Sequence, residues 1–267
     1  MLPPEPRREA EAARQGASTS PDADVAIRLS PRSVRRALLV VIAILTVASA
    51  VAQVLKYPLD TPNARGLVPL FDSDAEANIP TWYSALALLA CSLLAGAIAL
   101  SSQRARSRYA WHWVGLSIVF FVAALDEAVA LHELLNAWLS SAFDTGGLLF
   151  LPWVVPGTLV VIALAIAYRP FIASLPDRVR RLATGGAVVF VVGALGLEMV
   201  EGKIAESHDG SGSFADGLVS VGQEFLEMLG VILFIEALMT YMALKRSTVT
   251  IQFGETRATA SPPELEG

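Results

Sequence analysis

The chain has 267 residues, of which 54% are hydrophobic and only 17% are charged, with a formal net charge of −5. This composition is too apolar for an ordinary soluble domain of this length. No basic patch with interleaved aromatic residues occurs, so nothing indicates nucleic-acid binding. Cys91 is the only cysteine, which excludes an intrachain disulfide.

Apolar residues gather in six runs, each close to the ~20 residues that a helix needs to cross a bilayer. Because lipid offers no hydrogen-bond partners to the backbone, each run is predicted to be a helix. The spans are expected at about 37–55, 81–100, 111–134, 149–167, 183–202 and 219–244. Together they predict an all-α bundle, a six-helix transmembrane domain over 34–246.

The flanking segments 1–33 and 247–267 lack apolar periodicity and are expected to be disordered cytoplasmic tails. The first run contains Ala48-Ser49-Ala50, which has the form of a signal-peptide cleavage site. The leader before it would be unusually long, so we expect a retained helix, with a cleaved signal as the alternative. Residues 134–143 are expected to form a short helix on the outer surface.

Basic residues alternate strictly between successive loops. Of the 20 Lys and Arg residues, 17 fall in the two tails and in the second and fourth loops. Only Lys56, Arg65 and Lys203 fall in the other loops. The positive-inside rule then places both termini in the cytoplasm of a bacterial-type inner membrane. Trp153 and other aromatic residues at the ends of the runs are expected to be interface anchors.

Acidic residues occur near the predicted outer ends of the third, fifth and sixth spans: Asp126, Glu127 and Glu133 with His132, then Glu198 and Glu201, then Glu224 and Glu227. Asp126 and Glu133 are seven residues apart, and the glutamates of the later spans form pairs three apart, so each set is predicted to share a helix face. We expect these three helices to adjoin and to form an acidic cup that opens to the periplasm. Glu236 is expected to be a separate hydrogen-bonding residue.

No Lys or Arg lies inside any predicted span, so internal ion pairs are not expected to neutralise these carboxylates. One ionised side chain at mid-bilayer costs at least ~2.5–3.5 kcal/mol. Protonation, a bound cation or a water-filled cavity is therefore required. In the fifth span, close helix contacts are expected at Gly185, Gly186, Gly193 and Gly196.

Clustered carboxylates with one imidazole suit Mn, Fe, Zn or Ca. We expect a divalent metal site formed by Asp126, His132, Glu133, Glu198, Glu201, Glu224 and Glu227. Glu127 is expected to be a second-shell residue or proton acceptor. A bound metal would permit redox or hydrolytic chemistry, although no catalytic residue stands out.

Two alternatives remain open. Intramembrane acids also occur in proton- or cation-coupled transporters and channels. The second alternative is a non-catalytic scaffold or sensor, in which the acidic cup binds a periplasmic cation or partner and the Arg-rich loops contact anionic lipid.

Overall fold

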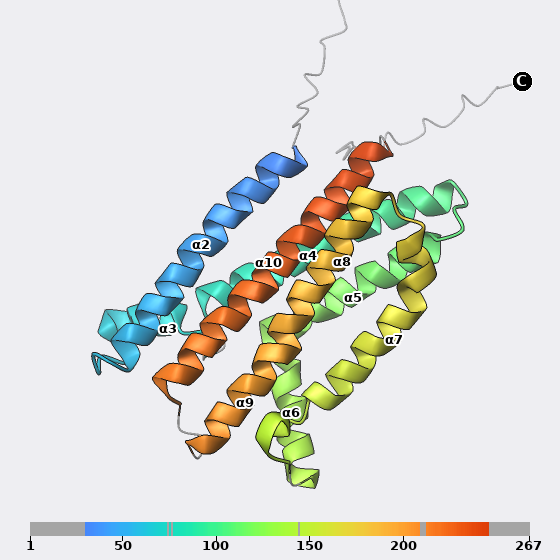
Figure 1. The fold of residues 1–267 in the computed structure, drawn as a ribbon. Coiled ribbons are helices and arrows are strands. Elements are labelled where there is room, and N and C mark those ends of the chain that lie inside the picture. The colour runs from blue at the N-terminus through green and yellow to red at the C-terminus, as the bar shows by residue number, and fades with distance from the viewer. Residues whose placement is uncertain (1–29, 74, 76, 144, 209–211, 246–267) are drawn as a thin grey trace, which may run out of the picture. The chain divides into compact units, whose positions relative to one another are not determined.

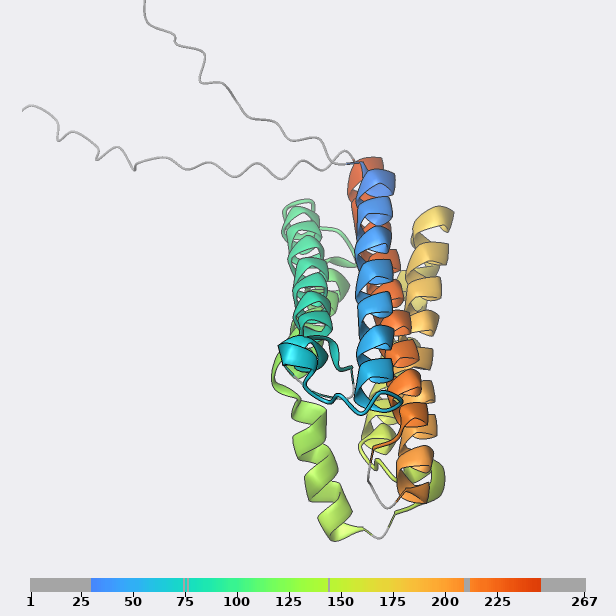
Figure 2. The same ribbon diagram turned by 90° about the vertical axis from the view of Figure 1, so that its left-hand side faces the viewer.

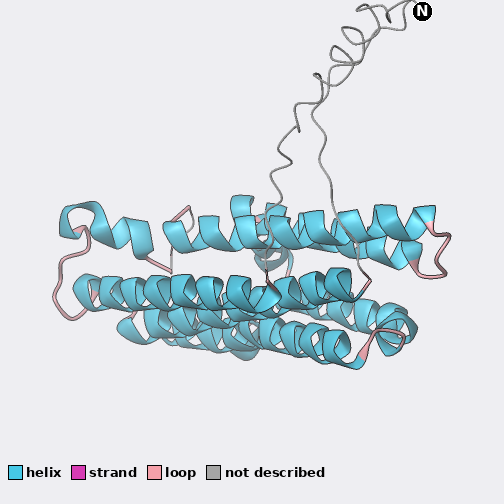
Figure 3. Ribbon diagram, turned by 90° about the horizontal axis from the view of Figure 1, so that it is seen from above, coloured by secondary structure: helices cyan, strands magenta, loops and turns pink. Residues whose placement is uncertain are grey.

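The computed structural model describes residues 30–73, 75, 77–143, 145–208 and 212–245. In this part of the chain all regular structure is helical (Figure 3). Most of segment 1–33 and all of 247–267 lie outside the described residues, so the two tails stay a prediction. The first helix already begins at Pro31.

Six helical stretches are long and apolar enough to cross a membrane, which confirms the predicted all-α class with six such helices. Five of them are α2 (Pro31–Lys56), α4 (Ile79–Arg104), α5 (Ala110–Val129), α7 (Val154–Ala173) and α10 (Phe214–Leu244). The remaining stretch, Asp177–Ser207, joins α8 (Asp177–Val191), the π-helical turn η3 (Val192–Leu197) and α9 (Glu198–Ser207). The shorter elements are η1 (Ala64–Gly66), α3 (Leu67–Phe71), α6 (Leu131–Ala142) and η2 (Gly147–Leu149).

The third predicted span is too long at its C-terminal end. The helix stops at Val129 because Ala130 adopts a left-handed conformation, with φ 51° and ψ 51°. The chain restarts as α6 at Leu131, which confirms a short helix in this region. Asp126 and Glu133 therefore lie on different helices, and the predicted stacking of these two residues on one helix face is wrong.

Consecutive long helices run antiparallel (Figure 1). Helix α10 is central to the bundle, because it packs against α2, α4, α8, η3 and α9; α2 lies alongside it in both Figure 1 and Figure 2. Helices α4 and α5 form a second close pair. We call the end that holds Val129, Ser207 and Phe214 the acidic end, and the end that holds Pro31 and Leu244 the basic end.

Helices α8 and α10 approach each other at two glycines. A Cβ added at Gly186 would lie 2.9 Å from the carbonyl oxygen of Gly230, and one at Gly230 would lie 2.8 Å from the carbonyl oxygen of Gly186. Gly193 also faces α10, since its Cβ would lie 3.0 Å from Cγ of Glu227. The expected close contacts are thus confirmed at Gly186 and Gly193. They are wrong at Gly185, which faces open space, and at Gly196, where a Cβ would meet only Val192 of the same stretch.

We predict that Gly186→Ala destabilises the bundle, whereas Gly185→Ala does not. A methyl group at position 186 meets backbone that cannot rotate away, and such overpacking costs ~1–3 kcal/mol. At position 185 the added methyl meets nothing, and helix propensity favours Ala by up to ~1 kcal/mol. Thermal unfolding can be followed with a thiol-reactive dye, because the sole cysteine, Cys91, is fully buried. Equal unfolding temperatures for the two variants would contradict the close crossing.

Glu236, near the basic end of α10, is held by two arginines. Its carboxylate is 1% exposed; Arg35 of α2 donates to Oε2 at 2.9 Å, and Arg178 of α8 donates to Oε1 at 3.1 Å. For this residue the expectation of no internal ion pair is wrong, because long arginine side chains reach inward from the helix ends. The triad joins α2, α8 and α10.

Replacing Glu236 with Gln is expected to lower thermal stability without affecting the acidic end. The substitution leaves two arginines facing each other without a counter-charge. Removing one partner of a fully buried ion pair costs ~3–5 kcal/mol, but these arginines are partly exposed, so we expect ~1–3 kcal/mol. The double variant Arg35→Gln/Glu236→Gln should recover part of the loss, and failure to recover any would argue against the ion pairs.

Candidate functional site

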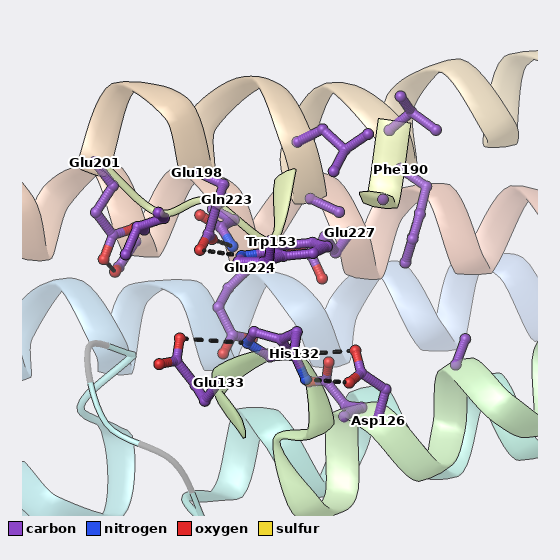
Figure 4. Close-up of a pocket in the computed structure, with 18 of the residues that line it drawn as sticks. Asp126, His132, Glu133, Trp153, Phe190, Glu198, Glu201, Gln223, Glu224 and Glu227 are labelled. Carbon is purple, nitrogen blue, oxygen red and sulfur yellow. Dashed lines mark hydrogen bonds and ion pairs between the residues drawn. The ribbon is translucent and has the colours of Figure 1, made fainter. Parts of the chain in front are cut away.

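A cavity of ≈ 640 Å³ lies at the acidic end of the bundle. The eight residues expected at the site all line it: Asp126, Glu127, His132, Glu133, Glu198, Glu201, Glu224 and Glu227. They come from α5, α6, α9 and α10, and Figure 4 shows seven of them labelled on two opposed sides. The structure thus brings seven carboxylates and one imidazole around a single space.

On the side formed by α5 and α6, the break at Ala130 pairs Asp126 with His132. The backbone N–H of His132 donates to Oδ1 of Asp126 at 2.8 Å, and the ring atom Nδ1 lies 3.1 Å from Oδ2. Glu133 lies on the other edge of the ring, 3.7 Å from Nε2. A left-handed alanine costs ~1–2 kcal/mol, and this turn is what lets one carboxylate contact both the backbone and the ring of His132.

On the opposite side, hydrogen bonds hold the carboxylates of α9. Both oxygens of Glu198, which is 6% exposed, accept N–H donors: Nε1 of Trp153 at 2.9 Å and Nε2 of Gln223 at 2.8 Å (Figure 4). Ser220 donates its hydroxyl to Glu201 at 2.9 Å. These donors from α10 and from the residue before α7 fix the direction in which Glu198 and Glu201 point.

Trp153 connects the two sides of the cavity. Its ring centroid lies 5.2 Å from that of His132, while its N–H binds Glu198. The sequence suggested only an interface anchor at this position, so the role of Trp153 was missed. Ser220 was missed as well. The role of Gln223 could have been predicted from the sequence, because a side-chain amide at lipid depth next to Glu224 needs a hydrogen-bond partner.

The π-helical turn η3 ends immediately before Glu198. A π turn inserts one extra residue, which rotates the following helix by about 100° relative to an unbroken one. Such turns are frequent at functional sites. Here the turn sets which way the α9 glutamates face, and Gly193 inside it allows the close approach to Glu227. Glu198 and Glu201 both follow the turn, so it does not alter the predicted position of these two side chains on one helix face.

One cluster of carboxylates combines residues of α5, α9 and α10. Glu227 is within electrostatic range of Glu127, Glu224 and Glu198. Glu127 therefore lies with the main cluster, whereas the sequence suggested a supporting position. Among the described residues that line the cavity, His132 is the only basic one. The carboxylates are thus close to one another and in excess.

The described residues form no group of three or more His, Cys, Asp or Glu side chains arranged to hold a metal ion. These side chains occur instead as Asp126, His132 and Glu133 on one side of the cavity and a glutamate cluster on the other. A metal site would require glutamate side chains to turn toward a common point.

Six helices long and apolar enough to cross a membrane define this chain as a multi-pass membrane protein. Its sequence matches a family described as a domain of unknown function (DUF8692) over residues 37–242. The chain belongs to this family, and the matched region includes every residue that lines the cavity. No curated protein and no solved structure matches the chain.

The pKa of His132 is raised to about 9. Burial of the ring lowers the pKa, but the hydrogen bond and charge of Asp126, together with the charges of Glu198 and Glu133, outweigh this effect. The imidazole is therefore protonated at neutral pH, and its positive charge offsets part of the surplus negative charge in the cavity.

We predict that thermal stability falls as the pH rises from about 6.5 to about 9. The folded-state pKa of His132 lies above the unfolded value, so its contribution is complete at low pH and is lost as the folded protein gives up this proton. His132→Gln should flatten the slope. His208→Gln is the matched control, because His208 is exposed and does not line the cavity. An unchanged slope in His132→Gln would exclude this residue as the source.

Proposed function

We propose that the acidic cavity binds a divalent cation from the periplasmic side of a bacterial-type inner membrane. The observation that supports this is the charge imbalance in one ≈ 640 Å³ space, where seven carboxylates meet one imidazole. Like charges packed together in a low-dielectric environment are unfavourable unless protons or cations accompany them.

The donor types fit hard or borderline ions such as Mn, Fe, Zn or Ca. The cluster of Glu127, Glu198, Glu224 and Glu227 supplies oxygen ligands. His132 at the facing wall supplies the one nitrogen once the metal displaces its proton. Hydrogen bonds from Trp153 and Gln223 to Glu198 resemble the outer-shell contacts that orient metal ligands. Binding requires the longer glutamates to rotate inward, and the cavity volume allows it.

The proposed orientation rests on the basic residues. Among the described residues, 11 Lys and Arg residues lie at the basic end and only Lys56, Arg65 and Lys203 lie at the acidic end. The positive-inside rule assigns the basic end to the cytoplasm. The cavity then faces the periplasm, where its cation would enter. A bound metal would supply Lewis-acid or redox chemistry.

Transport is the second candidate, and the packing of the bundle disfavours it. Large buried side chains occupy the region between the cavity and the basic end, among them Trp113, Phe120, Phe171 and Leu238. Beyond them, Glu236 already binds two arginines. A route across the membrane would have to open this core, so binding at one side explains the structure better.

Elemental analysis of the purified protein tests the proposal. We expect about one equivalent of a divalent metal in the wild type, and loss of at least about tenfold in affinity on Glu227→Gln. Glu206→Gln is the matched control, because Glu206 lies on α9 outside the cavity and should retain the metal.

Two results would overturn the proposal. The first is a wild-type protein that binds none of Mn²⁺, Fe²⁺, Zn²⁺ or Ca²⁺ by elemental analysis or titration. The second is metal that stays bound in Glu227→Gln and Glu198→Gln alike. Cation flux into liposomes without stable binding would favour the transporter.

A further inference from the structure

The cavity has two chemically different halves. The acidic half contains the seven carboxylates and His132. The apolar half extends toward the middle of the bundle and is lined by Leu88 of α4, Ala123 of α5, Val160 and Val161 of α7, Phe190 of α8 and Leu195 of η3. Figure 4 shows Phe190 beside the glutamate cluster. An ion alone would need only the acidic half.

Helix α7 forms the loosely packed wall of the apolar half. Its only buried residues are Val154 and Phe171, near its two ends. At the acidic end it is held through Trp153, and at the basic end Tyr168 donates to the carbonyl of His112 at 3.2 Å. Between these attachments, Val160 lines the cavity and is still 58% exposed. The cavity therefore reaches the lipid-facing surface beside the middle of α7.

We propose that the cavity takes a single-chain lipid with a positively charged head group, such as a long-chain amine. The hydrocarbon chain would enter beside α7 and lie in the apolar half, and the head group would lie among the carboxylates. The inference rests on the proposed cation site, because it assigns the head group to the same acidic half.

Charge and size select this class of ligand. The head group would lie among seven carboxylates that only one imidazole accompanies, so a cationic head group is favoured and a carboxylate or phosphate is repelled. The volume of ≈ 640 Å³ lies within the range of about 300–1,000 Å³ that is typical of small-ligand pockets. A single chain with a small head group matches it better than a two-chain phospholipid.

Photo-crosslinking in phosphatidylcholine nanodiscs tests the inference. The probes are a long-chain amine and the chain-matched fatty acid, each with a diazirine in mid-chain, and labelled peptides are identified by mass spectrometry. We expect the amine to label the cavity-lining residues of α7 and α8, around Val161 and Phe190, at least about tenfold more than the fatty acid does.

Two tryptophan variants of α7 separate the cavity from the lipid-facing surface. Val161→Trp fills the apolar half and should reduce labelling of Phe190 by about tenfold. Leu159→Trp introduces the same side chain on the same helix, but Leu159 is 63% exposed and does not line the cavity, so labelling should persist. Equal labelling by amine and fatty acid, or equal loss in both variants, would overturn the inference.

The metal content of the same samples distinguishes the two proposals. Val161→Trp should keep its metal while losing the amine, because the substitution lies in the apolar half. A wild-type protein that crosslinks the amine but binds no metal would refute the proposed function and leave the lipid site standing. Bound metal without amine crosslinking would refute the lipid site and leave the proposed cation site standing.

Discussion

The whole acidic end of this protein depends on one electrostatic constraint: carboxylates that enter the lipid zone need positive charge or hydrogen-bond donors. The chain meets this requirement in two ways. At the basic end, Glu236 receives two arginines and becomes a joint between three helices. At the acidic end, donors from Trp153, Gln223 and Ser220 orient the α9 glutamates. Among the described residues that line the cavity there, only His132 carries positive charge. At the basic end the charge of Glu236 is fully balanced by its arginines. At the acidic end a surplus of carboxylates remains, which a ligand can neutralise.

Hydrophobicity and spacing were sufficient to predict the bundle and the composition of the site. Helix count follows from the length of the apolar runs, and the eight ionisable residues of the cavity were recognisable because lipid-embedded segments rarely contain them. The details of geometry were not predictable in this way. A left-handed Ala130 and a π turn before Glu198 depend on tertiary packing, and neither alanine nor the Val192–Leu197 sequence indicates such a departure from regular helix.

The contacts of side chains that reach from one helix to another could not be predicted from the sequence either. Arg35 and Arg178 lie near helix ends, so their sequence positions gave no sign that they extend to Glu236. The sequence position of Trp153 is that of an ordinary interfacial tryptophan, and only the structure shows its indole between His132 and Glu198. Partners of this kind are set by which helices adjoin, and a single sequence does not contain that information.

The position of Trp153 has a consequence for motion. Its indole ties α7 to both walls of the cavity, while the middle of that helix is buried against little else. Any event that alters the charge on His132 or Glu198 therefore changes the anchorage of α7 at the acidic end. The other end of the helix is held by the contacts of Phe171 with His112 and Trp113 of α5, which do not depend on charge in the cavity.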